Sequence, residues 1–547
     1  MVLDWKTHSC LGYTLIILFV GFPVWWATTT GKEKLKKINL FFFIYLHFSG
    51  GFSVSSPVTS SFFGNVIFNY NLHFTVDRAN LPYEEIQNLK DPILALSILL
   101  ISDDASEVHD LGPKLQQLFQ NARLLNINFR SRVRSELEQD AFATIKNLQN
   151  LDQRISELHP ATSNSLILFE TSSLLFSNEE NILAIGQDKT LFFRAGAESS
   201  QLVKAIQEII GIDLIDNIGT AIISPSQDKN PQWTLRRPTA SSSFDILFSL
   251  MIPEPERFKP RWKIEESIQK YFHPILNSIS EVYDVSVKSQ ILYLTSLNLK
   301  PTNKNGYFAT TQNELGLALN TGSQFSSHVS SRQTLNFLTY IPTSRSSPLQ
   351  IVDNLGKIVS TNAFLVPRWG GVLILNTNQT DLDMKPVMSV YVTHFRSLIG
   401  LNHYNTRTTF KIGNEIIAPI EKAFLIRLGC VENLAVSKMT MQSLSHLLTK
   451  ISNIVINEEV SEQVYSAVLD YSKAIANADL GMLDEAFQQS KKSVISSEKA
   501  FFDHRLLALL YFPEDQKYAI YIPLFLPIFI SYFGSIRSVF QDVFARK

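Results

Sequence analysis

Two long uncharged runs near the ends of the 547-residue chain are the strongest feature of its hydrophobic pattern. The first covers Ser9–Gly31, and from Leu11 to Ala27 it reads LGYTLIILFVGFPVWWA. A helix needs about 20 mostly apolar residues to cross a bilayer core, and a Trp pair at the end of such a run favours the membrane–water interface. The pattern predicts a transmembrane helix over residues 11–30. The alternative is a cleaved signal peptide, but its cleavage site would need small residues where this run has two Trp.

The second run is Tyr518–Ile536, which reads YAIYIPLFLPIFISYFGSI and contains no charged residue. It predicts a second transmembrane helix over residues 518–536, within which proline is tolerated in lipid. The tail that follows carries three basic residues and one acidic residue. Positive flanks favour the cytosol, so residues 537–547 and the amino terminus, residues 1–10, are both predicted to be cytosolic.

With both termini in the cytosol, the bulk of the chain is predicted to face the lumen or the exterior. The tripeptide Asn378-Gln379-Thr380 agrees with that side, because it is an acceptor sequence for N-glycosylation. We therefore predict a glycan on Asn378.

Between the runs, short apolar segments bounded by turn residues alternate with helical patterns. The predicted strands are Ile93–Ile101, Ser165–Glu170, Leu191–Phe193, Gly219–Ile223, Asp245–Ile252 and Gly371–Asn376. The predicted helices are Gly112–Leu124, Ser200–Ile210 and Trp262–His273. This alternation predicts an α/β region over residues 76–428 and leaves open whether its sheet is parallel. Residues 429–512 show helical periodicity instead, with helices expected near 434–455, 460–478 and 480–497. The expected fold is a membrane-anchored α/β protein with a helical carboxyl-terminal portion and one transmembrane helix at each end.

Composition and motifs restrict the chemistry. The 49 basic and 50 acidic residues give a net charge of −1, which does not suggest a nucleic-acid-binding protein. No HExxH, GxSxG, GxxxxGK[ST] or GxGxxG sequence occurs. We therefore predict no catalytic residue, no metal site and no cofactor in this chain. The two cysteines are Cys10 and Cys430, too few for a thiolate metal site; Cys430, expected at the start of a helix, is interpreted as structural.

One turn between the predicted elements has residues typical of a protein interface. Thr361–Gly370 reads TNAFLVPRWG, and Arg and Trp side chains often carry interface energy. Arg368 and Trp369 are therefore candidate partner contacts. The alternative is a tight turn before a strand, in which Trp369 packs into the core and Arg368 is solvated.

Eight stretches distributed along the chain carry a resemblance to a known family. They are GFPVWW (Gly21–Trp26), RANLPYEEI (Arg78–Ile86), SQILYL (Ser289–Leu294), LNFLTYIP (Leu335–Pro342), TNAFLVPRWGG (Thr361–Gly371), VENLA (Val431–Ala435), KISNIVI (Lys450–Ile456) and a long stretch at Ser496–Pro527. Together and in this order they resemble the PIG-S family of glycosylphosphatidylinositol (GPI) transamidase subunits. The resemblance covers the whole chain except about residues 31–75.

The resemblance implies a non-catalytic subunit of the GPI transamidase in the endoplasmic reticulum membrane, with a scaffold or substrate-handling role. That complex attaches preassembled GPI anchors to the carboxyl terminus of precursor proteins. The implied partners are the PIG-K, PIG-T, PIG-U and GPAA-type subunits, with catalysis in PIG-K. Membrane lipid, the GPI glycolipid and the precursor protein are implied contacts of the complex.

Residues 31–75 depart from the family pattern, in which only a few residues separate the Trp pair from the RANLPY stretch. The segment opens with GKEKLKK, whose four lysines would favour the cytosol, and continues with INLFFFIYLHF, which is too short to cross a bilayer comfortably. We interpret it as a translated intron or another gene-model error. The alternative is a lineage-specific insertion that is disordered or interfacial, and sequencing of the mature transcript decides between them.

Two other classes of function compete with the scaffold hypothesis. One is a lumenal membrane-anchored hydrolase whose active-site residues are dispersed through the α/β region. The other is an independent two-span organiser that works as a homo-oligomer. Co-purification with PIG-K and PIG-T would favour the transamidase subunit over both.

Overall fold

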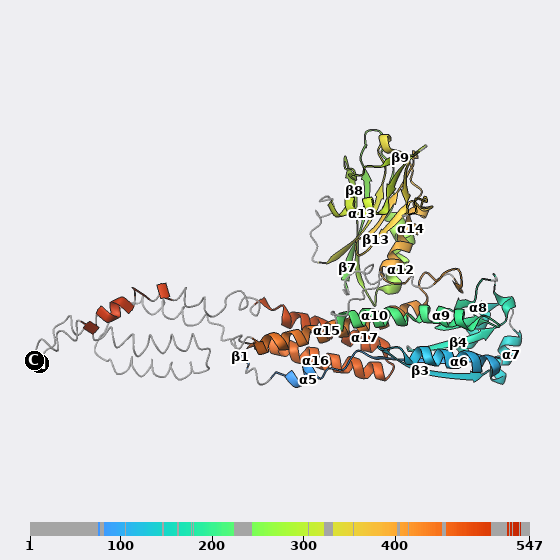
Figure 1. Ribbon diagram of the computed structural model, residues 1–547, viewed down its shortest axis with the longest axis horizontal. Coiled ribbons are helices and arrows are strands. Elements are labelled where there is room, and N and C mark those ends of the chain that lie inside the picture. Colours follow the sequence, from blue (N-terminus) through green and yellow to red (C-terminus); the bar gives the residue numbers. More distant parts are fainter. Residues whose placement is uncertain are drawn as a thin grey trace, which may run out of the picture. The chain divides into compact units, whose positions relative to one another are not determined.

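The structure is a computed structural model that describes residues 75–76 and 81–504, with short helical pieces within residues 522–537 (Figure 1). Internal gaps fall at residues 104, 145–146, 161–163, 177, 179, 224–242, 305, 322–331, 354, 402–404, 414 and 451–455. The predicted span over residues 11–30, residues 31–74 of the proposed insertion and much of the predicted span over residues 518–536 lie outside the described residues. Within the described part, no helix combines the length and hydropathy that a membrane crossing requires.

The chain divides into two compact units. The first consists of Met1–Tyr83, Ser443–Tyr465 and Glu498–Lys547, and the second of Glu84–Gln442 and Ser466–Ser497. In the first unit, strand β1 (Thr75–Val76) pairs antiparallel with β16 (Ile456–Asn457). Thr75, the last residue of the proposed insertion, is therefore part of this pairing.

A six-stranded sheet in the second unit has the order β15-β5-β6-β4-β2-β3. Its strands are β2 (Leu94–Ser102), β3 (Leu125–Val133), β4 (Ser165–Thr171), β5 (Leu183–Ile185), β6 (Thr190–Arg194) and β15 (Thr409–Lys411). Every pair is parallel except β5 with β6. Strand β4 is buried along nearly its whole length, as a strand covered on both faces requires, whereas β2 exposes Ser97 and only Leu125 is buried in the edge strand β3. The sequence left open whether the sheet of the α/β region is parallel, and this sheet is parallel in every pair but one.

Helices connect and cover these strands. They are α5 (Tyr83–Gln87), α6 (Ala105–Gln120), α7 (Glu136–Thr144), α8 (Leu148–Leu158), α9 (Ser199–Ile210) and α10 (Ile212–Ile223). Helix α6 packs on β3 and β2 and begins well before the predicted Gly112, with Pro113 inside it (Figure 1).

The strand predicted at Gly219–Ile223 is wrong, because these residues form the end of α10. The short run GTAII is apolar enough to resemble a strand when it is taken alone. Together with the preceding residues, the buried positions 212, 215, 218 and 219 follow helical spacing, and Asp213 lies in the first turn.

A five-stranded sheet has the order β13-β14-β11-β7-β8. Its strands are β7 (Ser243–Ile252), β8 (Asp284–Tyr293), β11 (Gln333–Tyr340), β13 (Ala363–Val366) and β14 (Gly370–Ile374). Only β13 runs antiparallel to its neighbour. A smaller sheet, β12-β10-β9, consists of β9 (Thr302–Lys304), β10 (Tyr307–Thr311) and β12 (Leu349–Val352).

Aromatic side chains fill the space between this second sheet and its helices. The helices are α11 (Ile264–Ser267), a π-helical segment (Ile268–Phe272), α12 (His273–Ile279), α13 (Gln312–Thr321) and α14 (Met384–Leu398). The rings of Phe248 and Phe337 stack at 5.5 Å between centroids, and Phe272 meets Phe248 edge-on at 5.2 Å. Such ring pairs add to the free energy gained from burial alone, by about 0.5–1.5 kcal/mol each.

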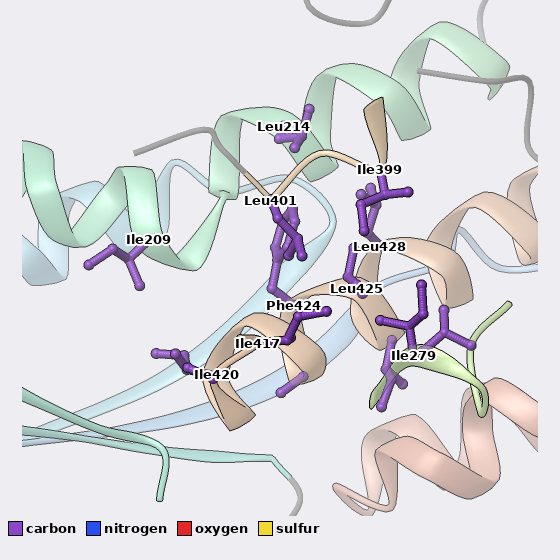
Figure 2. Packing of buried hydrophobic residues seen from close by; sticks show 14 of the residues in the cluster. Ile209, Leu214, Ile279, Ile399, Leu401, Ile417, Ile420, Phe424, Leu425 and Leu428 are labelled. Carbon is purple, nitrogen blue, oxygen red and sulfur yellow. The ribbon is translucent and has the colours of Figure 1, made fainter. Parts of the chain in front are cut away.

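Three long helices follow: α15 (Pro419–Lys450), α16 (Glu458–Asp479) and α17 (Leu483–Phe501). Figure 2 shows Phe424 and Leu428 of α15 among buried residues that include Leu401, which follows α14. Helix α15 begins at Pro419, so the expectation that Cys430 starts a helix is wrong. Proline is well suited to a first helical turn, and Glu421 accepts a hydrogen bond from the Ala418 amide at 2.9 Å.

Candidate functional site

The only cysteine in the described part of the chain lies in the interior of α15. Cys430 is fully buried, and burial raises the pKa of its thiol to about 12, although a hydrogen bond with Ser490 acts in the opposite direction. A nucleophilic cysteine needs a stabilised thiolate that the substrate can reach. At neutral pH Cys430 is a neutral thiol inside the core and provides neither.

The turn between β13 and β14 holds the two predicted partner contacts. Trp369 is half-buried against the core cluster of the second sheet, and its carbonyl accepts a hydrogen bond from the Asn336 amide at 2.7 Å. Arg368 is exposed and has a φ of 61°. The geometry is that of a tight strand-entry turn with a solvated arginine. Contact with a partner at Arg368 and Trp369 stays a prediction.

The predicted glycosylation residue Asn378 is exposed in the loop between β14 and α14. The third residue of its acceptor sequence, Thr380, is fixed through its carbonyl, which accepts a hydrogen bond from the Arg261 amide at 2.7 Å. The side chain is accessible to a modifying enzyme, and the modification itself stays a prediction.

A polar cluster lies at the carboxyl ends of β2, β3 and β4. Glu170 accepts hydrogen bonds from the Ser102 hydroxyl at 2.5 Å and from the Asp103 amide at 2.7 Å. Buried Arg134 pairs with Asp103 at 3.4 Å and donates to the Glu170 carbonyl. The strand order reverses at β2, with β3 on one side of it and β4 on the other, and open α/β sheets usually bind ligands at such a position. Here these side chains bind one another and hold the strand ends together.

A second ionic network stands beside it. Glu138 is buried and accepts hydrogen bonds from Arg132 at 2.5 Å, His159 at 2.6 Å and the Ser135 amide at 2.7 Å. Burial raises the pKa of this carboxyl, but the hydrogen bonds outweigh burial and lower the pKa to about 2. Glu138 therefore stays ionised and ties α7 to β3 and to the end of α8.

The start of α15 carries a third network. Glu421 accepts hydrogen bonds from Arg396 of α14 at 2.5 Å and from Lys411 of β15 at 2.6 Å. Burial favours the neutral acid, but the two cations outweigh it and lower the pKa of Glu421. Glu421 thus joins the first turn of α15 to α14 and to an edge strand of the first sheet.

Beside this helix start lies a cavity of about 670 Å³, which we take as the candidate functional site. Its lining comes from the β5–β6 turn, α12 and the residues after it, the segment before α15, one face of α15 and the start of α17. Ile416, Ile417, Ile426 and Leu483 supply apolar wall, while Lys189 and Lys422 supply positive charge.

The sequence reasoning missed this site because its lining residues are separated by up to about 300 positions along the chain. No sequence motif marks the cavity, although the residue that follows its lining residue Ile426 is conspicuous in the sequence. Arg427 is the only charged residue between Lys422 and Glu432, within the apolar helical stretch AFLIRLGCV. A charge in such a stretch is unusual unless it has a partner.

Within the residues that the structure describes, no group of three or more His, Cys, Asp or Glu side chains is arranged to hold a metal ion.

Comparison with known proteins identifies the family. A family model described as phosphatidylinositol-glycan biosynthesis class S protein (PIG-S) matches residues 73–546. A GPI-anchor transamidase component PIGS from Rattus norvegicus is 32% identical over 570 residues, which cover 98% of this chain and 95% of the relative. The protein of the same name from Homo sapiens is 31% identical over 565 residues, with the same two coverages. A GPI transamidase component PIG-S homolog from Schizosaccharomyces pombe is 26% identical over 301 residues, covering 53% of this chain and 52% of the relative.

The family match begins at residue 73, so it leaves out nearly all of the proposed insertion and includes the β1 strand. Its range takes in the four described sheets, the candidate cavity and the three long helices. The chain belongs to the PIG-S family.

Proposed function

We propose that this protein is a non-catalytic subunit of the GPI transamidase, the complex that attaches preassembled GPI anchors to precursor proteins. Its role is that of a scaffold or a substrate-handling subunit. The proposal is supported by relatives named as GPI transamidase components that align with nearly the whole chain. The expected partners are PIG-K, PIG-T, PIG-U and GPAA-type subunits, with the catalytic cysteine in PIG-K.

The observation that carries the non-catalytic role is the environment of Cys430. Transamidation by a cysteine enzyme needs a thiolate that can reach an amide carbonyl. The Cys430 thiol is fully buried in α15, and its pKa is raised to about 12. This side chain supports packing between α15 and α17 rather than attack on a substrate.

The proposed location is the endoplasmic reticulum membrane, with transmembrane helices over residues 11–30 and 518–536 and both termini in the cytosol. The two sheets and the long helices would then lie in the lumen. The support is the pair of uncharged runs and the basic carboxyl-terminal tail.

Co-purification from detergent tests the subunit assignment. A tagged full-length chain should bring down PIG-K-type and PIG-T-type subunits, and its depletion should remove GPI-anchored proteins from the cell surface. Re-expression of the Cys430→Ala variant should restore them to the wild-type level. Purification of the tagged chain without any transamidase subunit would reject the assignment, and loss of rescue by a Cys430→Ala variant that still enters the complex would reject the non-catalytic role.

A further inference from the structure

Strand β8 forms one edge of the five-stranded sheet. It runs parallel to β7 along its whole length of ten residues, and no other strand in the described part of the chain pairs with it. The outer side of an edge strand presents peptide N–H and C=O groups that a further strand can bind. The edge of β8 is therefore long enough to serve as a template for one more strand.

The hydrogen bonds to β7 show which peptide groups of β8 face away from the sheet. The Leu294 amide donates to the Ile252 carbonyl at 3.0 Å, and Ile252 lies opposite Tyr293. In a parallel pair, every second residue of a strand binds the same neighbour through both its N–H and its C=O, so the even-numbered residues of β8 bind β7. The peptide groups of residues 285, 287, 289 and 291 therefore point outward. This row ends at Tyr293, whose carbonyl accepts a hydrogen bond from the Thr295 hydroxyl at 2.9 Å.

The edge of β8 lacks the features that usually protect an edge strand. Natural edges are short, or they carry charged side chains, prolines or bulges that discourage an added strand. At the other edges of the two large sheets, β13 has four residues and β15 has three, while β3 is long but exposes Arg130. Strand β8 has no proline, and the Nζ of Lys288 is 2.8 Å from a carboxylate oxygen of Asp245 on β7. Its lysine is therefore held over the sheet and does not guard the edge.

The side chains of the outward-facing residues form an apolar row. Successive side chains of a strand alternate between its faces, so the odd-numbered side chains of β8 share one face. Val285 and Val287 pack against the main core, whereas Ile291 and Tyr293 remain 39% and 40% exposed. Pairs of aromatic and β-branched side chains across two strands stabilise a sheet. The row is therefore suited to a strand that carries apolar side chains at alternate positions.

A positive charge lies at the end of this row. Lys259 is exposed, and its Nζ is 5.4 Å from the centre of the Tyr293 ring. Leu294, which follows β8, is 78% exposed. A carboxylate at the corresponding end of an added strand would pair with Lys259 while an apolar neighbour covers Leu294.

We propose that the edge of β8 binds an extended segment of another transamidase subunit, which joins the five-stranded sheet as an additional strand. The segment has apolar side chains at alternate positions and an acidic residue at the end beside Lys259. Hydrogen bonds between main chains provide the affinity in this mode of recognition, and the alternate side chains provide the specificity. The choice of a different chain as the partner rests on the proposed function, since a subunit of a complex works among other chains.

Hydrogen exchange resolved to single amides tests the proposal on the detergent-purified full-length chain and on the complex purified with it. In the chain alone, the outward amides of Val287, Ser289 and Ile291 should exchange fast. In the complex they should exchange more slowly by about tenfold or more, because each amide then donates to the partner strand. The amides of Ser286 and Gln290 should exchange slowly in both samples, because they bind β7. Fast exchange of the three outward amides in the complex would overturn the proposal.

Two proline substitutions separate binding at the edge from stability. Ser289→Pro removes an outward N–H that β7 does not use, so this variant should unfold at nearly the wild-type temperature. It should nevertheless reduce the recovery of the partner subunit with the tagged chain by about fivefold or more. Ser286→Pro removes an amide that binds β7 and should unfold at a clearly lower temperature. Ser289→Ala keeps the outward N–H and should retain the partner, and full retention by a folded Ser289→Pro chain would reject the edge.

The charge at the end of the row has its own test. Lys259→Glu should reduce the recovery of the same subunit, because a carboxylate of the partner would then face a like charge. Lys204→Glu on α9 makes the same change of charge on another element and should leave recovery unchanged. Equal recovery with the two variants would reject the acidic residue of the partner.

The proposed function and this edge fail in different ways. A wild-type chain that purifies without any transamidase subunit would reject the function and, with it, this partner. A chain that brings the subunits down while its outward amides exchange fast would reject the edge alone. Light scattering identifies a second copy as the occupant: a dimeric wild-type chain and a monomeric Ser289→Pro chain would assign the edge to self-association and overturn the proposal.

Discussion

At the scale of single residues, the buried charges fall into two kinds. Glu138 and Glu421 are each surrounded by cations and hydrogen-bond donors, so their ionised forms are stabilised in the fold. Arg427 has no such shell. A buried ion pair contributes little net stability, but a buried charge left alone is costly. The first kind thus fixes local structure, and the second carries a cost of burial that no described carboxylate offsets.

Glu138 should make this fold sensitive to acid. Its folded pKa of about 2 is below the ordinary value of 4.5, so its contribution to the free energy of unfolding is fully present above pH 4.5. That contribution is lost as the pH falls from 4.5 towards 2. Glu138→Gln should be less stable than the wild type at pH 7, and the difference should shrink steadily below pH 4.5.

Thermal unfolding at a series of pH values measures this difference. Glu157→Gln is the matched control, because Glu157 forms an exposed pair with Arg154 at 2.9 Å and surface pairs contribute only about 0–1 kcal/mol. A gap between Glu138→Gln and wild type that stays constant from pH 7 to pH 3 would contradict the assigned network.

Gly370 is the residue that the Arg368–Trp369 turn most depends on. It has a φ of 143°, and a Cβ at this position would lie 1.8 Å from the Asn336 carbonyl oxygen. Gly370→Ala must therefore move one strand backbone against another, and we expect a loss of more than about 3 kcal/mol in the free energy of unfolding. Gly316→Ala, whose Cβ would meet nothing within 4 Å, should be neutral or slightly stabilising. Urea denaturation of both variants measures the contrast, and equal stabilities would refute the role of Gly370.

At the scale of elements, sequence patterns located five of the described strands and missed others, including the long strands β3, β8 and β11. The predicted strands at 93–101, 165–170, 191–193, 245–252 and 371–376 correspond to β2, β4, β6, β7 and β14. All are short apolar runs between turn residues, the clearest strand signal. Gly219–Ile223 has the same signal and is helical, because the pattern of a short run does not separate a buried strand from the end of a buried helix. Only the preceding residues of the same helix, from Ile212 onwards, show the helical periodicity that separates the two possibilities.

The close packing around Gly219 also leaves no room for a side chain at this position. A Cβ there would lie 2.2 Å from Leu124 Cδ1 and 2.9 Å from Val431 Cγ1, so α10 approaches the segment before β3 and α15 closely. Gly219→Val should overpack this contact and lower the free energy of unfolding by about 1–3 kcal/mol.

A double variant tests that explanation directly. Combining Gly219→Val with Leu124→Ala provides room for the new side chain, so the double variant should be more stable than the sum of the two single effects predicts. Gly316→Val serves as the control for the helix propensity of valine. Strict additivity of the two single effects would show that the contact does not limit this position.

At the scale of the whole molecule, the sequence predicted the α/β class and the helical carboxyl-terminal portion but not the division of the described strands into four sheets. Strand order depends on pairings between distant segments, such as β15 with β5, which no local pattern encodes. The cavity escaped prediction for the same reason, since its lining residues Lys189 and Ile426 come from the β5–β6 turn and from α15, which are far apart in the sequence. In contrast, Arg368, Trp369 and Asn378 are local features, and their exposure matches what a turn and a loop would give.

The proposed topology leads to a prediction at Asn378. If residues 11–30 and 518–536 both span the membrane, the loop between β14 and α14 lies in the lumen, where its exposed asparagine meets the glycosylation machinery. The protein from cells should then migrate faster on a gel after treatment with peptide N-glycosidase. The Asn378→Gln variant should migrate at the faster position without treatment. Thr380→Ala should behave in the same way because it removes the acceptor sequence and leaves the asparagine, whereas Thr380→Ser should keep the glycan.

A glycan that is present on the wild type and lost only in Asn378→Gln and Thr380→Ala would place the loop in the lumen. The loop should then also be protected from a membrane-impermeant protease in sealed microsomes. Cleavage of the loop by that protease in intact microsomes would invert the proposed topology, whatever the state of Asn378.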